Sequence, residues 1–181
     1  MLQRAIRLTR NATLAFFAVN LLLGAALAQR ETVLYSFTGS PDGAGPFAGV
    51  IFDTKGNLYG TTVYGGAYGY GSVFKVTPSG EETVLYSFTG DSDGAYPYAG
   101  LVFDKKGNLY GTTIAGGANS LDGTVFEVTP SGEETVLHSF TGAPDGAYPR
   151  AGLVFDGRGN LYGTTYEGGA YNGGTVFKLV P

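Results

Sequence analysis

The 181-residue sequence predicts an all-β fold built from three copies of one antiparallel, four-stranded unit. The heptapeptide Gly-Asn-Leu-Tyr-Gly-Thr-Thr occurs at 56–62, 107–113 and 159–165, with spacings of 51 and 52 residues. Around it, short runs rich in Val, Ile, Tyr, Phe and Thr alternate with Gly, Pro, Asp and Ser, and no window has a helical stripe. This combination of period and composition is typical of a repeat protein made of β-strands.

The first 28 residues differ from the repeats and are expected to form a secretory signal peptide. Three arginines, Arg4, Arg7 and Arg10, precede a mostly apolar run from Leu14 to Leu27, and Ala26-Leu27-Ala28 matches a signal-peptidase site. The alternative is an uncleaved anchor, which needs about 20 apolar residues to span a bilayer. The run is shorter than that. We therefore expect cleavage, no membrane span afterwards, and a secreted, periplasmic or cell-surface location.

Residues 29–181 are expected to form one repeat domain. The sequence holds 15 acidic and 11 basic residues, and three of the basic ones lie in the signal, so the domain has a net charge of about −7. A negative surface argues against nucleic acid as a partner, because that binding depends on Lys and Arg. The sequence has no cysteine, so the core must form by burial without disulfides.

Each repeat is expected to contain four strands. In the first copy these are 31–37, 47–53, 57–63 and 72–77, and matching positions in the other copies give twelve strands in all. Short, nearly invariant turns join some of them, such as Asp53 to Asn57, where Asp caps the turn and Gly supplies a positive φ.

Four antiparallel strands in every 50 or so residues describe one blade of a β-propeller. The three blades would span about 31–81, 82–133 and 134–181. The first strand, Glu31 to Phe37, is then the outermost strand of a blade, and it is expected to close the last blade beside Thr175 to Val180. Propellers usually have about four to eight blades. We therefore expect a homodimer that completes a six-bladed ring; the alternatives are an open arc and a fragment of a larger propeller.

The repeated motifs resemble a known family. Gly-Asn-Leu-Tyr-Gly-Thr-Thr, Gly-Gly-Ala and Gly-Thr-Val-Phe are similar to the GloVer tandem repeat, and the resemblance covers Glu31 to Pro181. Such repeats occur in exported bacterial proteins described as choice-of-anchor, which differ in their surface-sorting signals; none is recognised before Pro181. The resemblance implies export and a propeller-like fold, and it implies no catalytic residues.

The longer, variable loops are expected to lie on one face and to carry the binding function. Aromatic rings with polar tips, next to carboxylates, suit a carbohydrate or a protein partner. The alternative is that Asp-Gly and Pro-Asp-Gly only form turns while the tyrosines cover the loop backbone. The candidate ligand-binding residues are Asp42, Asp91, Asp93, Asp145, Tyr68, Tyr70, Tyr96, Tyr98, Tyr148 and Tyr171, with Asp122, Tyr64 and Tyr166 in the same loops.

Catalytic residues, metals and cofactors are not expected. His138 is the only histidine and replaces the Tyr of the other copies, which favours a packing role. Asp91 to Gly94 resembles the start of a calcium loop, but its twelfth position is Val102 and not Glu. An enzyme acting on polysaccharide is the alternative function. It would need two carboxylates about 5 to 10 Å apart, with Glu167 and the loop aspartates as candidates.

The sequence therefore predicts a secreted, non-catalytic repeat scaffold. Its expected partner is a carbohydrate or an envelope protein.

Overall fold

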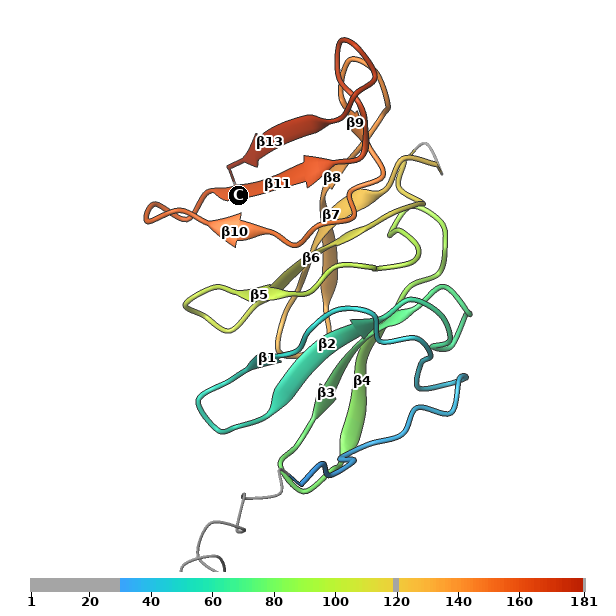
Figure 1. Cartoon of the computed structure of the whole chain (residues 1–181), viewed down its shortest axis with the longest axis vertical. Helices are drawn as coiled ribbons and strands as arrows, with labels where there is room; N and C mark the ends of the chain where they lie inside the picture. Colours follow the sequence, from blue (N-terminus) through green and yellow to red (C-terminus); the bar gives the residue numbers. More distant parts are fainter. Residues whose placement is uncertain (1–29, 119–120, 181) are drawn as a thin grey trace, which may run out of the picture. The chain divides into compact units, whose positions relative to one another are not determined.

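The computed structural model describes residues 30–118 and 121–180 (Figure 1). The chain divides into two units, Met1–Val33 and Leu34–Pro181. In the first unit the described residues, 30–33, form no strand. The expected signal peptide, residues 1–28, lies outside the described residues. The second unit contains the three repeats.

The strands of the second unit form four antiparallel sheets. The first sheet consists, in order, of β1 (Ile51–Phe52), β2 (Leu58–Thr62), β3 (Ser72–Val76) and β4 (Glu82–Ser87). The second sheet repeats it with β5 (Val102–Phe103), β6 (Leu109–Thr113), β7 (Thr124–Val128) and β8 (Glu134–Ser139). The third sheet has β10 (Val154–Phe155), β11 (Leu161–Thr165) and β13 (Thr175–Leu179), while β9 (Gly146–Ala147) pairs with β12 (Glu167–Gly168).

This architecture confirms the all-β class and corrects the number of strands. The described residues contain no helix, and two of the sheets have four strands, the fourth of which comes from the start of the next repeat. The third sheet has three strands, and the expected closing strand, Glu31 to Phe37, forms no strand. Phe37 instead packs on the first sheet, where its ring centroid lies 4.8 Å from that of Phe74. The N-terminal segment therefore does not close the last sheet in this structure.

A glycine at the centre of each heptapeptide explains part of the repeat pattern. Gly111 on β6 pairs with Phe126 on β7, and the phenyl ring lies over the glycine. A Cβ atom added to Gly111 would lie 2.5 Å from Cζ of Phe126. Gly60 and Gly163 face phenylalanines in the same way. The glycine is needed at this position for the ring to reach the core.

The core lies between successive sheets. Phe88, just after β4, stacks on Phe126 of the second sheet with centroids 5.0 Å apart, and both rings are almost fully buried. The same contact recurs between Phe140 and Phe177, at 5.2 Å. Each sheet therefore buries one face against the sheet that follows it in the chain, as expected for repeats that bury little apolar surface alone.

Short turns at one end of each sheet follow one design. The Asp53 carboxylate accepts hydrogen bonds from the backbone N–H groups of Lys55 and Asn57 at 2.8 and 2.9 Å. It also accepts one from the Tyr59 hydroxyl at 3.1 Å. Burial would raise the pKa of Asp53, but these hydrogen bonds and the one from the Asn57 amide lower it to about 2. The predicted capping role of this Asp is confirmed.

Candidate functional site

Five aromatic side chains from two repeats form a surface that we call the aromatic patch: Phe47, Tyr64, Tyr70, Tyr96 and Tyr98. Ring centroids lie 5.3 Å apart for Phe47 and Tyr98, 5.8 Å for Tyr64 and Tyr96, and 5.7 Å for Tyr70 and Tyr96. The nearby Tyr64 hydroxyl raises the pKa of Tyr98, so the two groups of rings lie next to each other. Phe47, Tyr64 and Tyr70 are 65 %, 47 % and 38 % exposed, and Tyr96 and Tyr98 are half-buried, so the patch is partly open to solvent.

The backbone of one patch residue is strained. Tyr96 has a φ of 58°, in the left-handed region, where the first repeat has Gly45 with a φ of 68°. A side chain in this conformation costs about 1 kcal/mol or more relative to glycine. The backbone carbonyl of Tyr96 accepts a hydrogen bond from the N–H of Ile114, which holds the loop in place. Tyr148 has the same conformation in the third repeat.

The side chain of Arg150 extends the aromatic patch into the third repeat. Arg150 occupies the position of Phe47 and Tyr98 in the repeat alignment, and its guanidinium carbon lies 4.3 Å from the ring centroid of Tyr166. Its charge acts on the Tyr98 hydroxyl and opposes the rise in the pKa of that group. Arg150 and Tyr166 therefore extend the aromatic patch with a positive charge.

Two of the predicted binding aspartates are buried inside their own loops. The Asp42 carboxylate accepts hydrogen bonds from the Tyr35 hydroxyl at 2.7 Å, the Thr38 hydroxyl at 2.9 Å and the Gly43 N–H at 2.8 Å. Burial would raise the pKa of Asp42, but these hydrogen bonds hold it well below its usual range. Asp93 makes the equivalent bonds to Tyr86 and Thr89 in the second repeat.

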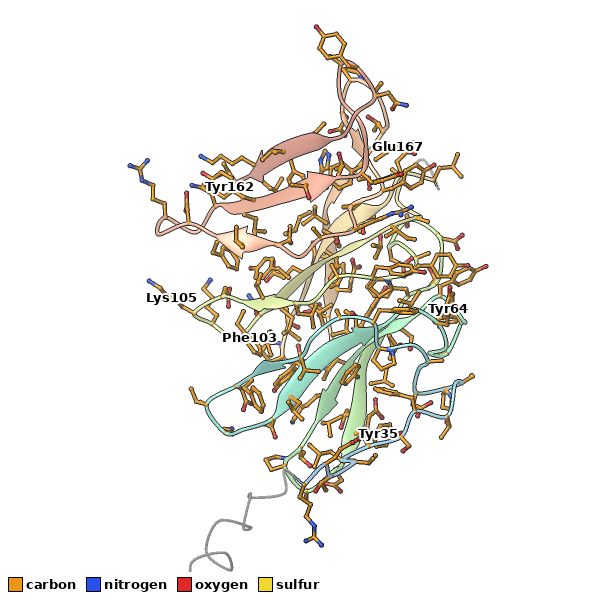
Figure 2. The ribbon with its side chains drawn as sticks, in the orientation of Figure 1. Tyr35, Tyr64, Phe103, Lys105, Tyr162 and Glu167 are labelled. Carbon is orange, nitrogen blue, oxygen red and sulfur yellow. The ribbon has the colours of Figure 1, made fainter. Side chains whose placement is uncertain are left out.

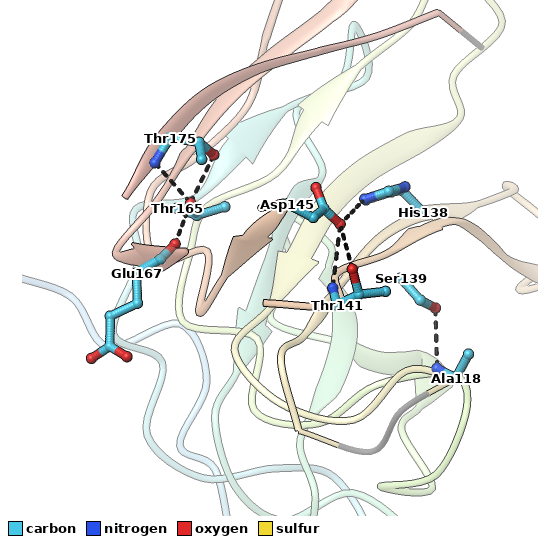
Figure 3. Close-up of polar contacts among 8 residues, drawn as sticks. All are labelled: Ala118, His138, Ser139, Thr141, Asp145, Thr165, Glu167 and Thr175. Atoms are coloured by element: carbon cyan, nitrogen blue, oxygen red, sulfur yellow. Dashed lines mark hydrogen bonds and ion pairs between the residues drawn. The ribbon is translucent and has the colours of Figure 1, made fainter. Parts of the chain in front are cut away.

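The third copy of this arrangement replaces the tyrosine with histidine (Figure 3). Nε2 of His138 lies 3.0 Å from Oδ2 of Asp145. The same oxygen also accepts hydrogen bonds from the Thr141 N–H at 3.2 Å and the Thr141 hydroxyl at 3.4 Å. The His138 ring also packs against Phe140, with centroids 4.8 Å apart. These contacts fit the predicted packing role of His138.

The structure does not bring the remaining candidates into the aromatic patch. In the described part of the chain, Tyr68, Tyr148 and Tyr171 make no ring–ring contact, and Tyr171 is 98 % exposed. Asp91 is exposed, and its backbone carbonyl, not its carboxylate, accepts a hydrogen bond from Gly117. The Asp122 carbonyl likewise accepts one from the Tyr148 N–H. Their role in binding stays a prediction.

The carboxylates suggested for polysaccharide hydrolysis do not face each other. Figure 3 shows the Glu167 carboxylate directed away from Asp145. The backbone carbonyl of Glu167 accepts a hydrogen bond from the Thr165 hydroxyl at 2.8 Å. Among the residues described, no group of three or more His, Cys, Asp or Glu side chains could hold a metal ion.

Sequence reasoning missed a groove of about 570 Å³ between the short turns of the second and third sheets. Phe103, Tyr110 and Phe155 line it, together with Lys105 and Arg158. Figure 2 shows Phe103 and Lys105 on one side of the unit and Tyr64 on the other. The available signal was the pair Lys106 and Arg158, which occupy corresponding turn positions in the two repeats. The groove lies away from the aromatic patch.

One carboxyl group, that of Glu134, should make the stability of the fold depend on pH. Oε1 of Glu134, on β8, is buried without a hydrogen-bond partner, and burial followed by the negative charge of Asp93 raises the pKa of Glu134 from 4.5 to about 7. The folded protein thus holds this proton more tightly than the unfolded chain does. Its contribution to stability is full below about pH 4.5 and is lost as the pH rises through 7.

We expect the Glu134→Gln variant to melt about 2 to 5 °C higher than the parent at pH 8, because a half-buried group gives a moderate effect. At pH 4 the two melting temperatures should converge. Thermal unfolding followed by circular dichroism at both pH values measures this. The matched control is Glu133→Gln at the exposed neighbouring position. An equal gain at pH 4 and pH 8 would contradict the assigned titration.

The chain belongs to a family of bacterial repeats. The family model described as the Gloeobacter/Verrucomicrobia repeat matches residues 24–181, and the chain is a member of that family. This confirms the resemblance stated from the motifs. A search of curated proteins finds no match.

Two solved structures are similar to parts of this chain. One is a protein provisionally described as a gluconolactonase, with 21 % identity and a TM-score of 0.44, covering 73 % of this chain and 43 % of that one. The other is PorZ, a surface component of the type-IX secretion system of Porphyromonas gingivalis, with 17 % identity and a TM-score of 0.46, covering 83 % of this chain and 20 % of that one. The chain thus spans less than half of either protein. Since both TM-scores lie below 0.5, neither supports a function for it.

Within residues 30–118 and 121–180, no helix is long and apolar enough to cross a membrane.

Proposed function

We propose that this chain is an exported, non-catalytic repeat protein that binds carbohydrate through the aromatic patch. The observation that carries the proposal is the cluster of exposed and half-buried rings from two repeats, joined by ring contacts and by the closeness of Tyr64 to Tyr98. Export follows from the expected signal peptide in the first 28 residues. Membership of the repeat family supports the non-catalytic part.

A sugar suits this surface better than an apolar ligand does. Pyranose rings present C–H bonds on a face, which pack on aromatic rings, and hydroxyl groups at their edge, which need hydrogen-bond partners. Phe47 and Tyr98 offer such faces with an angle of 34° between the rings. The hydroxyls of Tyr64 and Tyr98, and the guanidinium of Arg150, offer polar contacts next to them. A protein partner on the same patch is the other outcome of the test.

The strained backbone of Tyr96 supports a binding role. The first repeat shows that glycine can occupy this turn position, with Gly45 at nearly the same φ. Tyrosine nevertheless stands there in the second repeat, and its ring contacts both Tyr64 and Tyr70. Strain of this kind is retained where the side chain has a function.

The hydrolase alternative has no support from the contacts of its proposed residues. In the described part of the chain, Oδ2 of Asp145 makes all three of that side chain's hydrogen bonds, and Glu167 points away from it (Figure 3). Acid–base catalysis by two carboxylates needs both at the same bond of the substrate. We therefore do not propose catalysis.

The Tyr98→Ala variant is expected to bind carbohydrate about tenfold more weakly, since losing one stacking ring of the patch removes about 1.4 kcal/mol. A panel of immobilised glycans identifies the ligand class, and titration calorimetry with the best soluble oligosaccharide measures the affinity. Tyr171→Ala is the matched control, because its ring is 98 % exposed and lies outside the patch. If no glycan binds the folded protein, or if both variants lose affinity equally, the proposal fails.

A further inference from the structure

The last sheet exposes a face that the earlier sheets bury. Val73 on β3 and Val125 on β7 are 0 % exposed, because the next sheet covers them. Val176 occupies the same position on β13 and is 82 % exposed. Tyr59 is covered by Phe103 of the following sheet, with centroids 5.1 Å apart, whereas Tyr162 of the last sheet has Lys178 over its ring at 5.9 Å. We call this the outgoing face of the last sheet.

The first sheet exposes the opposite half of the same contact. Leu101 and Leu153 are 3 % and 2 % exposed, since each packs against the preceding sheet. Val50 stands at the equivalent place in the first repeat and is 44 % exposed. Phe52, the counterpart of Phe103, is 65 % exposed. We call this the incoming face of the first sheet. The molecule therefore buries the contact between an outgoing and an incoming face twice and leaves one of each exposed.

The edge of the last sheet lies beside the exposed outgoing face. In the first sheet β3 pairs with β4, whose sequence is Glu-Thr-Val-Leu-Tyr-Ser, but β13 lies at the edge of its sheet. The identical hexapeptide occurs at 31–36, where it forms no strand. A copy of the β4 sequence is therefore present at 31–36 outside any strand, while β13 has a free edge.

The end of that hexapeptide is already held where a fourth strand ends. The Tyr35 hydroxyl donates to Asp42 at 2.7 Å, as Tyr86 at the end of β4 donates to Asp93 at 2.9 Å. A Cβ atom on Gly80 would meet the carbonyl of Leu34, just as one on Gly132 would meet the carbonyl of Leu85. Figure 2 shows Tyr35 at this end of the second unit. Residues 34–37 thus contact the first sheet as β4 contacts the second.

We propose that a second copy of the chain binds head to tail, with its residues 31–36 adding a fourth strand to β13 and its incoming face covering the outgoing face of the last sheet. A second copy is the expected partner, because the same contact between an outgoing and an incoming face already forms twice between the repeats of one chain. Lys178 on β13 does not act as a charge that blocks the edge, since Lys75 occupies the equivalent position in the paired strand β3. A head-to-tail contact closes into a ring if the rotation allows it and otherwise continues as an open array.

Cross-linking tests the pairing and its register. Lys75 pairs with Thr83 in the first sheet, so Lys178 of one copy should pair with Thr32 of another. The chain has no cysteine, and all cross-links come from introduced ones. The chain recovered after export is prepared as two single variants, Thr32→Cys and Lys178→Cys. Mixed under oxidising conditions, they should form a disulfide-linked dimer that reductant removes.

The control for register is Ser36→Cys mixed with Lys178→Cys. Ser36 lies four residues, about 13 Å, from Thr32 along an extended strand, beyond the reach of a disulfide. No dimer should form. Equal cross-linking of both pairs, or none in the matched pair, overturns the proposal. A chain carrying both Thr32→Cys and Lys178→Cys that links only within itself also overturns it, in favour of closure within one molecule.

The solution mass gives an independent readout. Val176→Asp places a charge on the outgoing face at a residue that the single chain leaves exposed, so folding should be unaffected. Light scattering should show at least twice the chain mass for the parent and the single-chain mass for the variant. Tyr171→Asp, exposed and outside both faces, should keep the mass of the parent. A parent with the single-chain mass at about 100 μM, on the order of a weak protein dimer's dissociation constant, contradicts the proposal.

Discussion

The Phe126→Ala variant should lose about 3 to 5 kcal/mol of the free energy of unfolding. Phe126 is 0 % exposed, stacks on Phe88 from the preceding sheet, and covers Gly111 on the neighbouring strand. Removal of the ring leaves a cavity between two sheets and uncovers the backbone of Gly111. Because this loss is a large share of the stability of a small domain, much of the variant is expected to unfold at 37 °C.

Urea denaturation of the parent and the variant measures the loss. Phe52→Ala is the matched control, since the same residue type is 65 % exposed there and should change the stability of the single chain little. Phe177→Ala gives a graded comparison. Phe177 stacks on Phe140 in the same way but is only half-buried, so a smaller loss is expected. A loss at Phe126 no larger than that at Phe52 would show that burial between the sheets does not govern stability.

The strand positions were predictable because the repeat period and the turn residues mark them independently. The expected strand 57–63 contains β2, and 72–77 contains β3. The strand expected at 47–53 pairs only at Ile51–Phe52. Val50 and Phe52 both fit a strand by composition, but residues 47–50 form loop contacts instead, including the Phe47–Tyr98 stack. The composition of residues 47–53 favours an extended chain, but strand pairing also requires a neighbouring strand with free backbone groups.

The fate of residues 31–37 could not be predicted from local sequence. The hexapeptide at 31–36 is identical to β4, yet one forms a strand and the other does not. The difference lies in the neighbour: β4 follows β3 through a short turn, whereas the described residues include no strand before 31–36. Whether a copy of this hexapeptide forms a strand depends on a pairing partner. The outcome therefore follows from the arrangement of the sheets and not from the local sequence.

The aromatic patch was only partly predictable. Tyr70, Tyr96 and Tyr98 were expected to share a face, and ring contacts join them to Tyr64 and Phe47. The aspartates were expected there as well, but Asp42 and Asp93 are buried. A signal was available: an Asp follows each Tyr35, Tyr86 and His138 by seven residues. That fixed spacing indicates an internal hydrogen bond, which would leave the carboxylate unavailable to a ligand.

The Asp93→Ala variant should therefore lose about 2 to 4 kcal/mol of the free energy of unfolding, and not only ligand affinity. The Asp93 carboxylate accepts hydrogen bonds from the Tyr86 hydroxyl at 2.9 Å, the Thr89 N–H at 2.7 Å and the Thr89 hydroxyl at 2.6 Å. Without it, these donors lie partly buried with no acceptor, and each unpaired donor adds a desolvation penalty. Urea denaturation of both proteins gives the difference.

Asp91→Ala separates this structural role from a general effect of charge. Asp91 lies in the same loop, is exposed, and makes no side-chain hydrogen bond in the described part of the chain, so its loss should change stability by less than about 0.5 kcal/mol. Tyr86→Phe completes a double-mutant cycle with Asp93→Ala. Because the two groups share one hydrogen bond, the combined loss should be smaller than the sum of the single losses. If the loss in the double variant equals the sum of the two single losses, this hydrogen bond does not contribute to the free energy of unfolding. Asp93 would then again be a candidate for ligand binding.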